Sequence, residues 1–148
     1  MITVERTFLL EVPLDASMAY LEDFGHAEEW DPGTVRCLRV DEGPVRIGSS
    51  WQNTSRFRGR TTDLVYRLDA RGPRELVFIG VNKTVTARDV MRFESRSAAT
   101  TRMTYVASLR FNGLARLAEP VLRREFEGLA DKVAGRLPSA VRAHHGED

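Results

Sequence analysis

The feature that most constrains the fold is a run of strand-like segments followed by one long amphipathic helix. The candidate strands lie at residues 34–41, 47–57, 60–69, 75–81, 84–94 and 101–111. The links between them are short and rich in Gly, Pro, Asn and Ser, which is typical of turns. Because a parallel crossover needs roughly a dozen residues or more, links this short indicate antiparallel neighbours. We therefore expect one antiparallel sheet.

The long helix is predicted over residues 114–137, where apolar residues follow one stripe of a 3.6-residue repeat. Pro120 lies inside this span, so we expect the helix to begin or kink there. Pro138 is expected to mark its end. The sequence thus predicts one domain over residues 1–138, a length typical of a single domain, and a flexible tail over residues 139–148.

The N-terminal segment completes the predicted architecture. Residues 2–12 alternate apolar and polar side chains and read as a seventh strand. Two short helical stretches follow at residues 16–24 and 26–30, and the turn sequence at 31–33 ends the second. A long amphipathic helix needs one apolar surface to lie on, which a curled seven-stranded sheet supplies. We expect an α+β fold of this kind.

Composition excludes several classes of protein. The chain has 22 Lys and Arg against 21 Asp and Glu, a net charge of +1 without a basic stripe, so nucleic-acid binding is not expected. No apolar run is long enough for a membrane-spanning helix, and the first residues do not read as a signal peptide. Cys37 is the single cysteine, which rules out an intramolecular disulfide. A cytoplasmic location is therefore expected.

Several short motifs occur in an order that resembles a known family. They are Pro13 with Met18–Phe24, Trp30–Gly33, Tyr66–Leu68, Pro73–Phe78, Arg92–Glu94, Thr101–Tyr105, and Gly113 before the long helix. In this order they resemble the polyketide cyclase/dehydrase (SRPBCC) branch of the START-like, or Bet v 1-like, superfamily. Each motif is short and degenerate, so the resemblance rests on their order over roughly residues 2–138.

The resemblance implies a helix-grip fold, in which a curved sheet and a long C-terminal helix enclose a deep, largely apolar cavity. Members of the family bind lipids, polyketides, sterols, quinones and other bulky apolar molecules. Some catalyse cyclisation or dehydration, and many only bind or carry. The family has no universal catalytic motif to transfer to this chain.

Strand alternation selects the residues expected to face such a cavity. The predicted ligand-binding residues are Arg6, Trp30, Trp51, Asn53, Ser55, Tyr66, Asp89, Met91 and Tyr105. Asp89 and Tyr66 are also the predicted catalytic residues. A slip of one residue in register would invert any of these faces.

Asp89 is the most informative member, because a carboxylate among apolar neighbours is costly to bury unless it is paired or protonated. It is interpreted as a general acid or base; the alternatives are that it pairs with an arginine or that a bulge turns it outward. Arg6 interrupts the apolar face of the first strand. It would bind an anionic ligand or pair with Asp89, or else simply extend to the rim of the cavity.

No cofactor or metal is expected. The three histidines lack partners at metal-ligand spacing. The stretch 43–48 lacks the strand–turn–helix setting of a phosphate-binding loop.

Three functions are compatible with the sequence. The first is the binding or carriage of a bulky apolar molecule that is lipid-, polyketide- or aromatic-like. The second is a polyketide cyclase or dehydratase, and the third is an interaction module whose groove takes a partner segment. An exposed sheet edge or the loops at the cavity mouth also leave a homodimer open.

Overall fold

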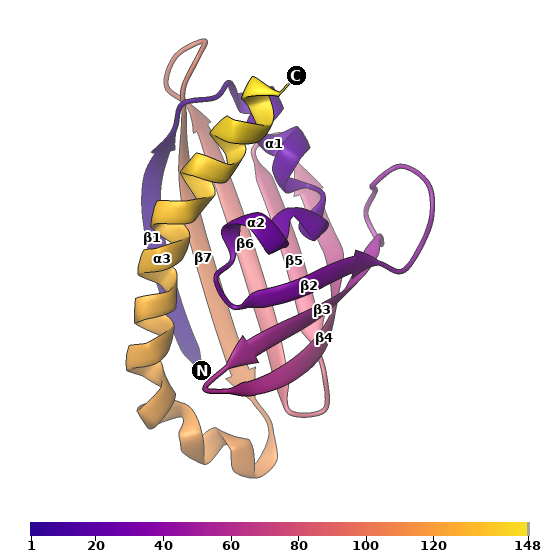
Figure 1. The fold of residues 1–148 in the computed structure, drawn as a ribbon, viewed down its shortest axis with the longest axis vertical. Coiled ribbons are helices and arrows are strands. Elements are labelled where there is room, and N and C mark those ends of the chain that lie inside the picture. The colour runs from indigo at the N-terminus through magenta and orange to yellow at the C-terminus, as the bar shows by residue number, and fades with distance from the viewer. Residues whose placement is uncertain (148) are drawn as a thin grey trace.

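A computed structural model of the chain describes residues 1–147. It contains one antiparallel seven-stranded sheet in the order β1-β7-β6-β5-β4-β3-β2 (Figure 1). The strands are β1 Ile2–Leu10, β2 Thr34–Arg39, β3 Ser50–Phe57, β4 Arg60–Gly72, β5 Glu75–Val81, β6 Val85–Ser95 and β7 Thr101–Phe111. β1 pairs with β7, the last strand, so the first segment of the chain lies beside the last part of the sheet. The expected curved sheet is confirmed.

The helices lie together on one side of this sheet (Figure 1). Two short ones follow β1: α1 Leu14–Leu21 and α2 Ala27–Trp30, joined by a 3₁₀ turn, Phe24–His26. A second 3₁₀ turn, Gly113–Ala118, leads into the long helix α3, Glu119–Gly146. The expected helix-grip arrangement, with two short helices after the first strand, is therefore confirmed.

Of the predicted span 114–137, the first residues form the 3₁₀ turn and the long helix begins next to Pro120, which confirms the start expected there; the predicted end is wrong. Pro120 lies in the first turn of α3, where its missing N–H costs little. Pro138 does not end the helix, which continues to Gly146. A proline inside a helix removes one hydrogen bond, but Leu137 and Val141 are buried on either side of it, and this packing holds the last turns in place. Asp148 lies outside the described residues, and the flexibility of residues 139–148 in solution stays a prediction.

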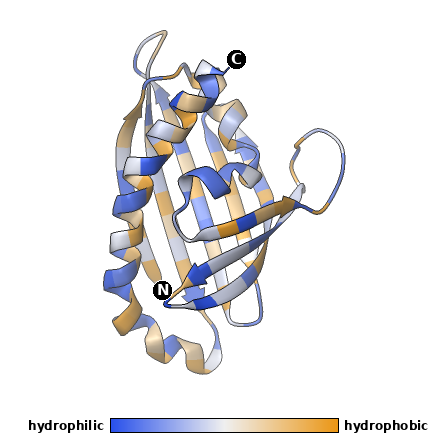
Figure 2. Cartoon of the chain, viewed as in Figure 1, coloured by the Kyte–Doolittle hydropathy of each residue, from blue (hydrophilic) through white to orange (hydrophobic). Residues whose placement is uncertain are grey.

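The core lies between the concave face of the sheet and the three helices. α3 contributes Val133, Leu137 and Val141 to it. The short helices and the 3₁₀ turn that joins them contribute Tyr20, Phe24 and Trp30. Along the strands, hydrophobic and hydrophilic residues alternate, as Figure 2 shows. On β6 the buried and exposed residues alternate from Val85 to Arg88, so the predicted inward face is confirmed there.

Within residues 1–147, no helix combines the length and the apolar character needed to cross a bilayer.

Candidate functional site

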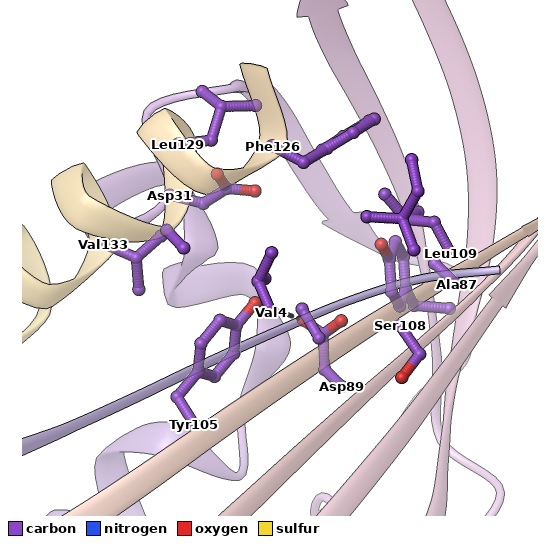
Figure 3. A pocket seen from close by; sticks show the side chains of 14 residues that line it. Val4, Asp31, Ala87, Asp89, Tyr105, Ser108, Leu109, Phe126, Leu129 and Val133 are labelled. Carbon is purple, nitrogen blue, oxygen red and sulfur yellow. Dashed lines mark hydrogen bonds between the residues drawn. The ribbon is translucent and has the colours of Figure 1, made fainter. Parts of the chain in front are cut away.

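A cavity of about 110 Å³ lies between α3 and the strands β1, β6 and β7. β4 and the segment after α2 contribute one residue each. Its lining residues are Ile2, Val4, Asp31, Tyr66, Ala87, Asp89, Tyr105, Ala107, Ser108, Leu109, Phe126, Leu129, Ala130 and Val133 (Figure 3). Most of this wall is apolar. The polar side chains that face it are two carboxyls and two phenols, whereas the hydroxyl of Ser108 bonds to Thr3 on the exposed face of the sheet.

Asp89 and Tyr105 form a hydrogen-bonded pair in this wall. Asp89 faces Ala107 across the β6–β7 ladder, and Tyr105 lies two residues along β7 on the same face. The Tyr105 hydroxyl donates to Oδ2 of Asp89 over 2.9 Å, shown as a dashed line in Figure 3. Oδ1 of Asp89 accepts no hydrogen bond from residues 1–147. One carboxylate oxygen is therefore held by the protein, and the other remains available.

Burial dominates the acid–base properties of this pair. Asp89 is only 6% exposed, and burial raises its pKa from 3.8 to about 7, with the negative charge of Asp31 adding to the rise and the Tyr105 hydrogen bond opposing it. Burial, together with the charges of Asp89 and Asp31, also raises the pKa values of Tyr66 and Tyr105. Asp89 is thus close to half-protonated near neutral pH, while both phenols keep their protons.

Asp31 is a cavity residue that the sequence analysis placed only in a turn. Its Oδ1 accepts from the backbone N–H of Gly33, and its Oδ2 accepts from the hydroxyl of Thr34. Burial raises the pKa of Asp31, although these two hydrogen bonds and the charge of Arg136 on α3 act in the opposite direction. The Asp-Pro-Gly sequence signalled the turn, but it held no sign that the carboxyl would reach a cavity beneath α3.

Tyr66 lies flat against β5 because its neighbour there is a glycine. Tyr66 and Gly80 are partners in the β4–β5 register. A Cβ atom on residue 80 would come within 2.6–2.8 Å of the Tyr66 ring, so the ring occupies space that only glycine leaves free. Phe24 stacks on the other side of the ring with 4.4 Å between centroids. These contacts fix Tyr66 in the cavity wall, as predicted for an inward-facing residue.

Arg6 lies outside the cavity lining and is tied to α3. Its guanidinium donates to the carboxylates of Glu127 and Asp131, over 2.9 Å in each case. Of the alternatives expected for Arg6, the pairing with Asp89 is therefore wrong. The reason is that α3 crosses β1 at this position, so its two carboxylates reach Arg6 at the edge of the sheet. Whether Arg6 touches an anionic ligand stays a prediction.

Four of the predicted ligand-binding residues lie in the core or on β3 and are not part of the cavity lining. Trp51 is fully buried and donates its indole N–H to Asp23. Met91 packs in the main core cluster. Asn53 donates to Thr34 and accepts from Ser55, so these side chains satisfy one another near β2. Their contact with a ligand stays a prediction.

Trp30 lies next to the Asp89–Tyr105 pair. Its ring meets Tyr105 edge-on at 5.9 Å between centroids and meets Phe24 in the same way. The indole Nε1 is buried and makes no hydrogen bond to any of residues 1–147. Trp30 therefore buttresses Tyr105 and carries a donor that the rest of the described chain does not use.

The helix side of the cavity was not predicted as a lining. Phe126, Leu129 and Val133 belong to the apolar stripe expected of the long helix, but Ala130 was not assigned to that stripe. Phe126, Leu129, Ala130 and Val133 form this side. Phe126 stacks on Phe57 of β3 at 5.0 Å, next to an ion pair between Arg58 and Glu125. These contacts connect the β3–β4 hairpin to α3 at the edge of the cavity.

In the part of the chain that the structure describes, no three His, Cys, Asp or Glu side chains lie close enough together to hold a metal ion.

Known structures with the same fold include proteins of several kinds. An aromatase/cyclase, Zhui from Streptomyces sp. R1128, aligns with a TM-score of 0.73 at 16% identity, over 96% of this chain and 92% of its own. A START superfamily protein from Mycobacterium smegmatis aligns with a TM-score of 0.78 at 9% identity, over 95% and 97% of the two chains. At these identities the likeness establishes the fold. No curated protein matches the sequence.

The sequence itself carries the family assignment. A family model described as polyketide cyclase/dehydrase and lipid transport matches residues 1–142, which is nearly the whole chain. The expected resemblance is thereby confirmed. The chain belongs to the polyketide cyclase/dehydrase and lipid transport family, within the START-like fold.

Proposed function

We propose that this protein binds a small apolar or aromatic molecule in the cavity beneath α3, with a polar group of that molecule placed at Asp89 and Tyr105. The observation that carries the proposal is a buried Asp–Tyr pair, with one free carboxylate oxygen, in an otherwise largely apolar wall. Sparse polar groups in an apolar pocket are the usual means of orienting a ligand. The family description, which includes lipid transport, is in keeping with this role.

The size of the cavity limits what fits without rearrangement. Its volume of about 110 Å³ is well below the roughly 300–1,000 Å³ of a typical drug-sized ligand pocket. An engineered apolar cavity of about 150 Å³ is known to hold benzene, so a single ring is the natural first probe. A bulkier polyketide- or lipid-like ligand requires α3 to move away from the sheet. The Phe57–Phe126 stack and the Arg6 ion pairs are the contacts that such a movement would break.

The test is to fill the cavity and measure binding of benzyl alcohol by titration calorimetry. Ala130 is buried on the cavity side of α3, so Ala130→Leu places its added carbons in the void. We expect the affinity to fall about tenfold or more, which corresponds to about 1.4 kcal/mol or more. Ala143→Leu, the same change at an exposed position of the same helix, should leave the affinity unchanged. Equal binding by wild type and Ala130→Leu would place the ligand elsewhere and contradict the proposal.

A second candidate function is acid–base catalysis of the cyclase or dehydratase type. The observation that favours it is the hydrogen-bonded Asp89–Tyr105 pair in the cavity wall, where burial raises the pKa of the carboxyl to about 7, a value that suits general acid–base chemistry near neutral pH. In a dehydration, the Asp89 carboxylate would take the proton next to a carbonyl, and the electron pair left behind would form the C=C bond as the C–O bond breaks. The protonated Asp89 would return that proton to the departing hydroxyl, which would leave as water. Loss of Asp89 in Asp89→Asn should then slow turnover of a β-hydroxyketone substrate by about 10²–10⁴-fold. Turnover unaffected by this substitution would exclude Asp89 as the catalytic group.

Other aspects of the proposal rest on the sequence. A cytoplasmic location and homodimer formation stay predictions, as does the use of the groove by a partner segment.

A further inference from the structure

The lining of the cavity contains acidic side chains but no basic ones. Its lining includes two carboxyl groups, Asp31 and Asp89, and none of its lining residues is Lys, Arg or His. Neither carboxylate forms an ion pair with a cationic side chain within residues 1–147. The apolar wall therefore encloses negative charge without a neighbouring counter-charge in contact with it.

Burying a carboxylate without a cation is costly, and the protein compensates only in part. Asp31 receives two hydrogen bonds and the more distant charge of Arg136. Asp89 receives one hydrogen bond, from Tyr105, and its Oδ1 receives none from the described chain. The groups that act on Asp89 are Tyr105 on β7 and Asp31 after α2, and neither is a cation; the remaining polar side chain that faces the cavity is the neutral phenol of Tyr66 on β4. From β1 the cavity receives only Ile2 and Val4, both apolar.

A ligand cation would supply the missing charge. An ammonium group donates several hydrogen bonds, and a charge-assisted bond to a carboxylate is roughly twice as strong as a neutral one. An anionic ligand would meet Asp31 and Asp89 with repulsion and without any lining cation to offset it. The attraction of an ammonium and the repulsion of an anion are both stronger here than in water, because the site is shielded from water.

From this arrangement we propose, on the basis of the ligand-binding function above, that the cavity selects apolar molecules carrying a protonated amine, with the ammonium placed at the free Oδ1 of Asp89. The apolar body of the ligand lies against Ala87, Ala107 and the α3 side chains. Asp89 is then a specificity-determining residue, because its charge distinguishes amines from neutral and anionic molecules of the same shape.

Three ring compounds of nearly equal size test this selectivity: benzylamine, benzyl alcohol and benzoate. At pH 8 the amine is protonated and the benzoate is ionised. We expect benzylamine to bind at least about tenfold more tightly than benzyl alcohol, and benzoate to bind more weakly than either. In Asp89→Asn the advantage of the amine over the alcohol should disappear. Asp69→Asn, which removes a carboxylate from an exposed position of β4, should retain the advantage.

A second readout uses the unmodified protein and so does not depend on the folding of a variant. Because the pKa of Asp89 is about 7, binding of the ammonium should displace a substantial fraction of a proton at pH 7 and almost none at pH 8, where Asp89 is already ionised and the amine is still protonated. Calorimetry in buffers of different ionisation enthalpy measures the number of protons released when the ligand binds. Benzyl alcohol should release no proton.

The outcomes separate the two proposals. If benzyl alcohol and benzylamine bind with equal affinity and no proton is released, the inference about amines is overturned while the proposed cavity function stands. If none of the three compounds binds, the proposed function is overturned as well.

Discussion

At pH 8, the Asp89→Asn variant should be more stable than the wild-type protein, by as much as about 4 kcal/mol. The folded protein holds the pKa of Asp89 at about 7, compared with the ordinary 3.8, a difference of roughly three pH units at about 1.36 kcal/mol each. Asparagine occupies the same space, carries no charge and can still accept the hydrogen bond from Tyr105. Removal of the charge therefore removes the cost of burying it.

The pH dependence of this difference gives the sharpest check. Between about pH 4 and 7 the folded state keeps a proton that the unfolded state has released, so the stability of the wild type falls as the pH rises through this range. The cost of the buried charge is absent below about pH 4 and complete above pH 7. Urea unfolding of both proteins at pH 4.5 and pH 8 should show a small difference at the lower pH and the full difference at the higher pH. An Asp89→Asn protein that is less stable than wild type at pH 8 would contradict the assigned burial.

Asp69→Asn serves as the control for this experiment. Asp69 lies on an exposed face of β4 and pairs with Arg67 over 2.7 Å. An exposed pair of this kind contributes about 1 kcal/mol or less. The stability of the control variant should therefore follow that of the wild type at both pH values.

Truncation of Trp30 should have an effect of similar size and opposite direction. Trp30→Ala is expected to lower the free energy of unfolding by about 3–5 kcal/mol, because it removes a large, fully buried side chain. The lost contacts are those with Phe24 and Tyr105. The resulting space would lie directly behind Tyr105, so the same variant should bind ligands with a larger ring than benzyl alcohol.

Chemical denaturation measures the loss of stability in Trp30→Ala. Leu117→Ala, a truncation at an exposed position, provides the comparison. Leu117 is 77% exposed, and truncation there should change the stability by no more than about 0.5 kcal/mol. A loss below about 1 kcal/mol in Trp30→Ala would show that the ring is not packed as the structure has it.

The order of the elements could be predicted from the sequence because short links and a two-residue period are local signals. The same period placed Asp89 and Tyr105 on the inner face, where the structure has them. It could not place a residue along the strand relative to α3. Asn53 and Ser55 have the correct face, but they lie in a part of β3 where they bond to each other and to Thr34.

The features that were missed depend on contacts between distant parts of the chain. Asp31 reaches the cavity only because α2 ends beneath α3, which no local pattern indicates. The end of α3 was misplaced because local propensity at Pro138 is outweighed by the burial of Leu137 and Val141. Arg6 was interpreted without the two α3 carboxylates that bind it.

The most direct test of the central claim is an NMR titration of alanine methyl groups with benzyl alcohol. Ala87, Ala107 and Ala130 line the cavity from β6, β7 and α3, whereas Ala99 and Ala143 are exposed elsewhere. If the ligand enters the cavity, the three lining methyl signals should shift together and saturably, and the two reference signals should stay unchanged. Shifts confined to exposed alanines, or none at the lining positions, would contradict binding beneath α3.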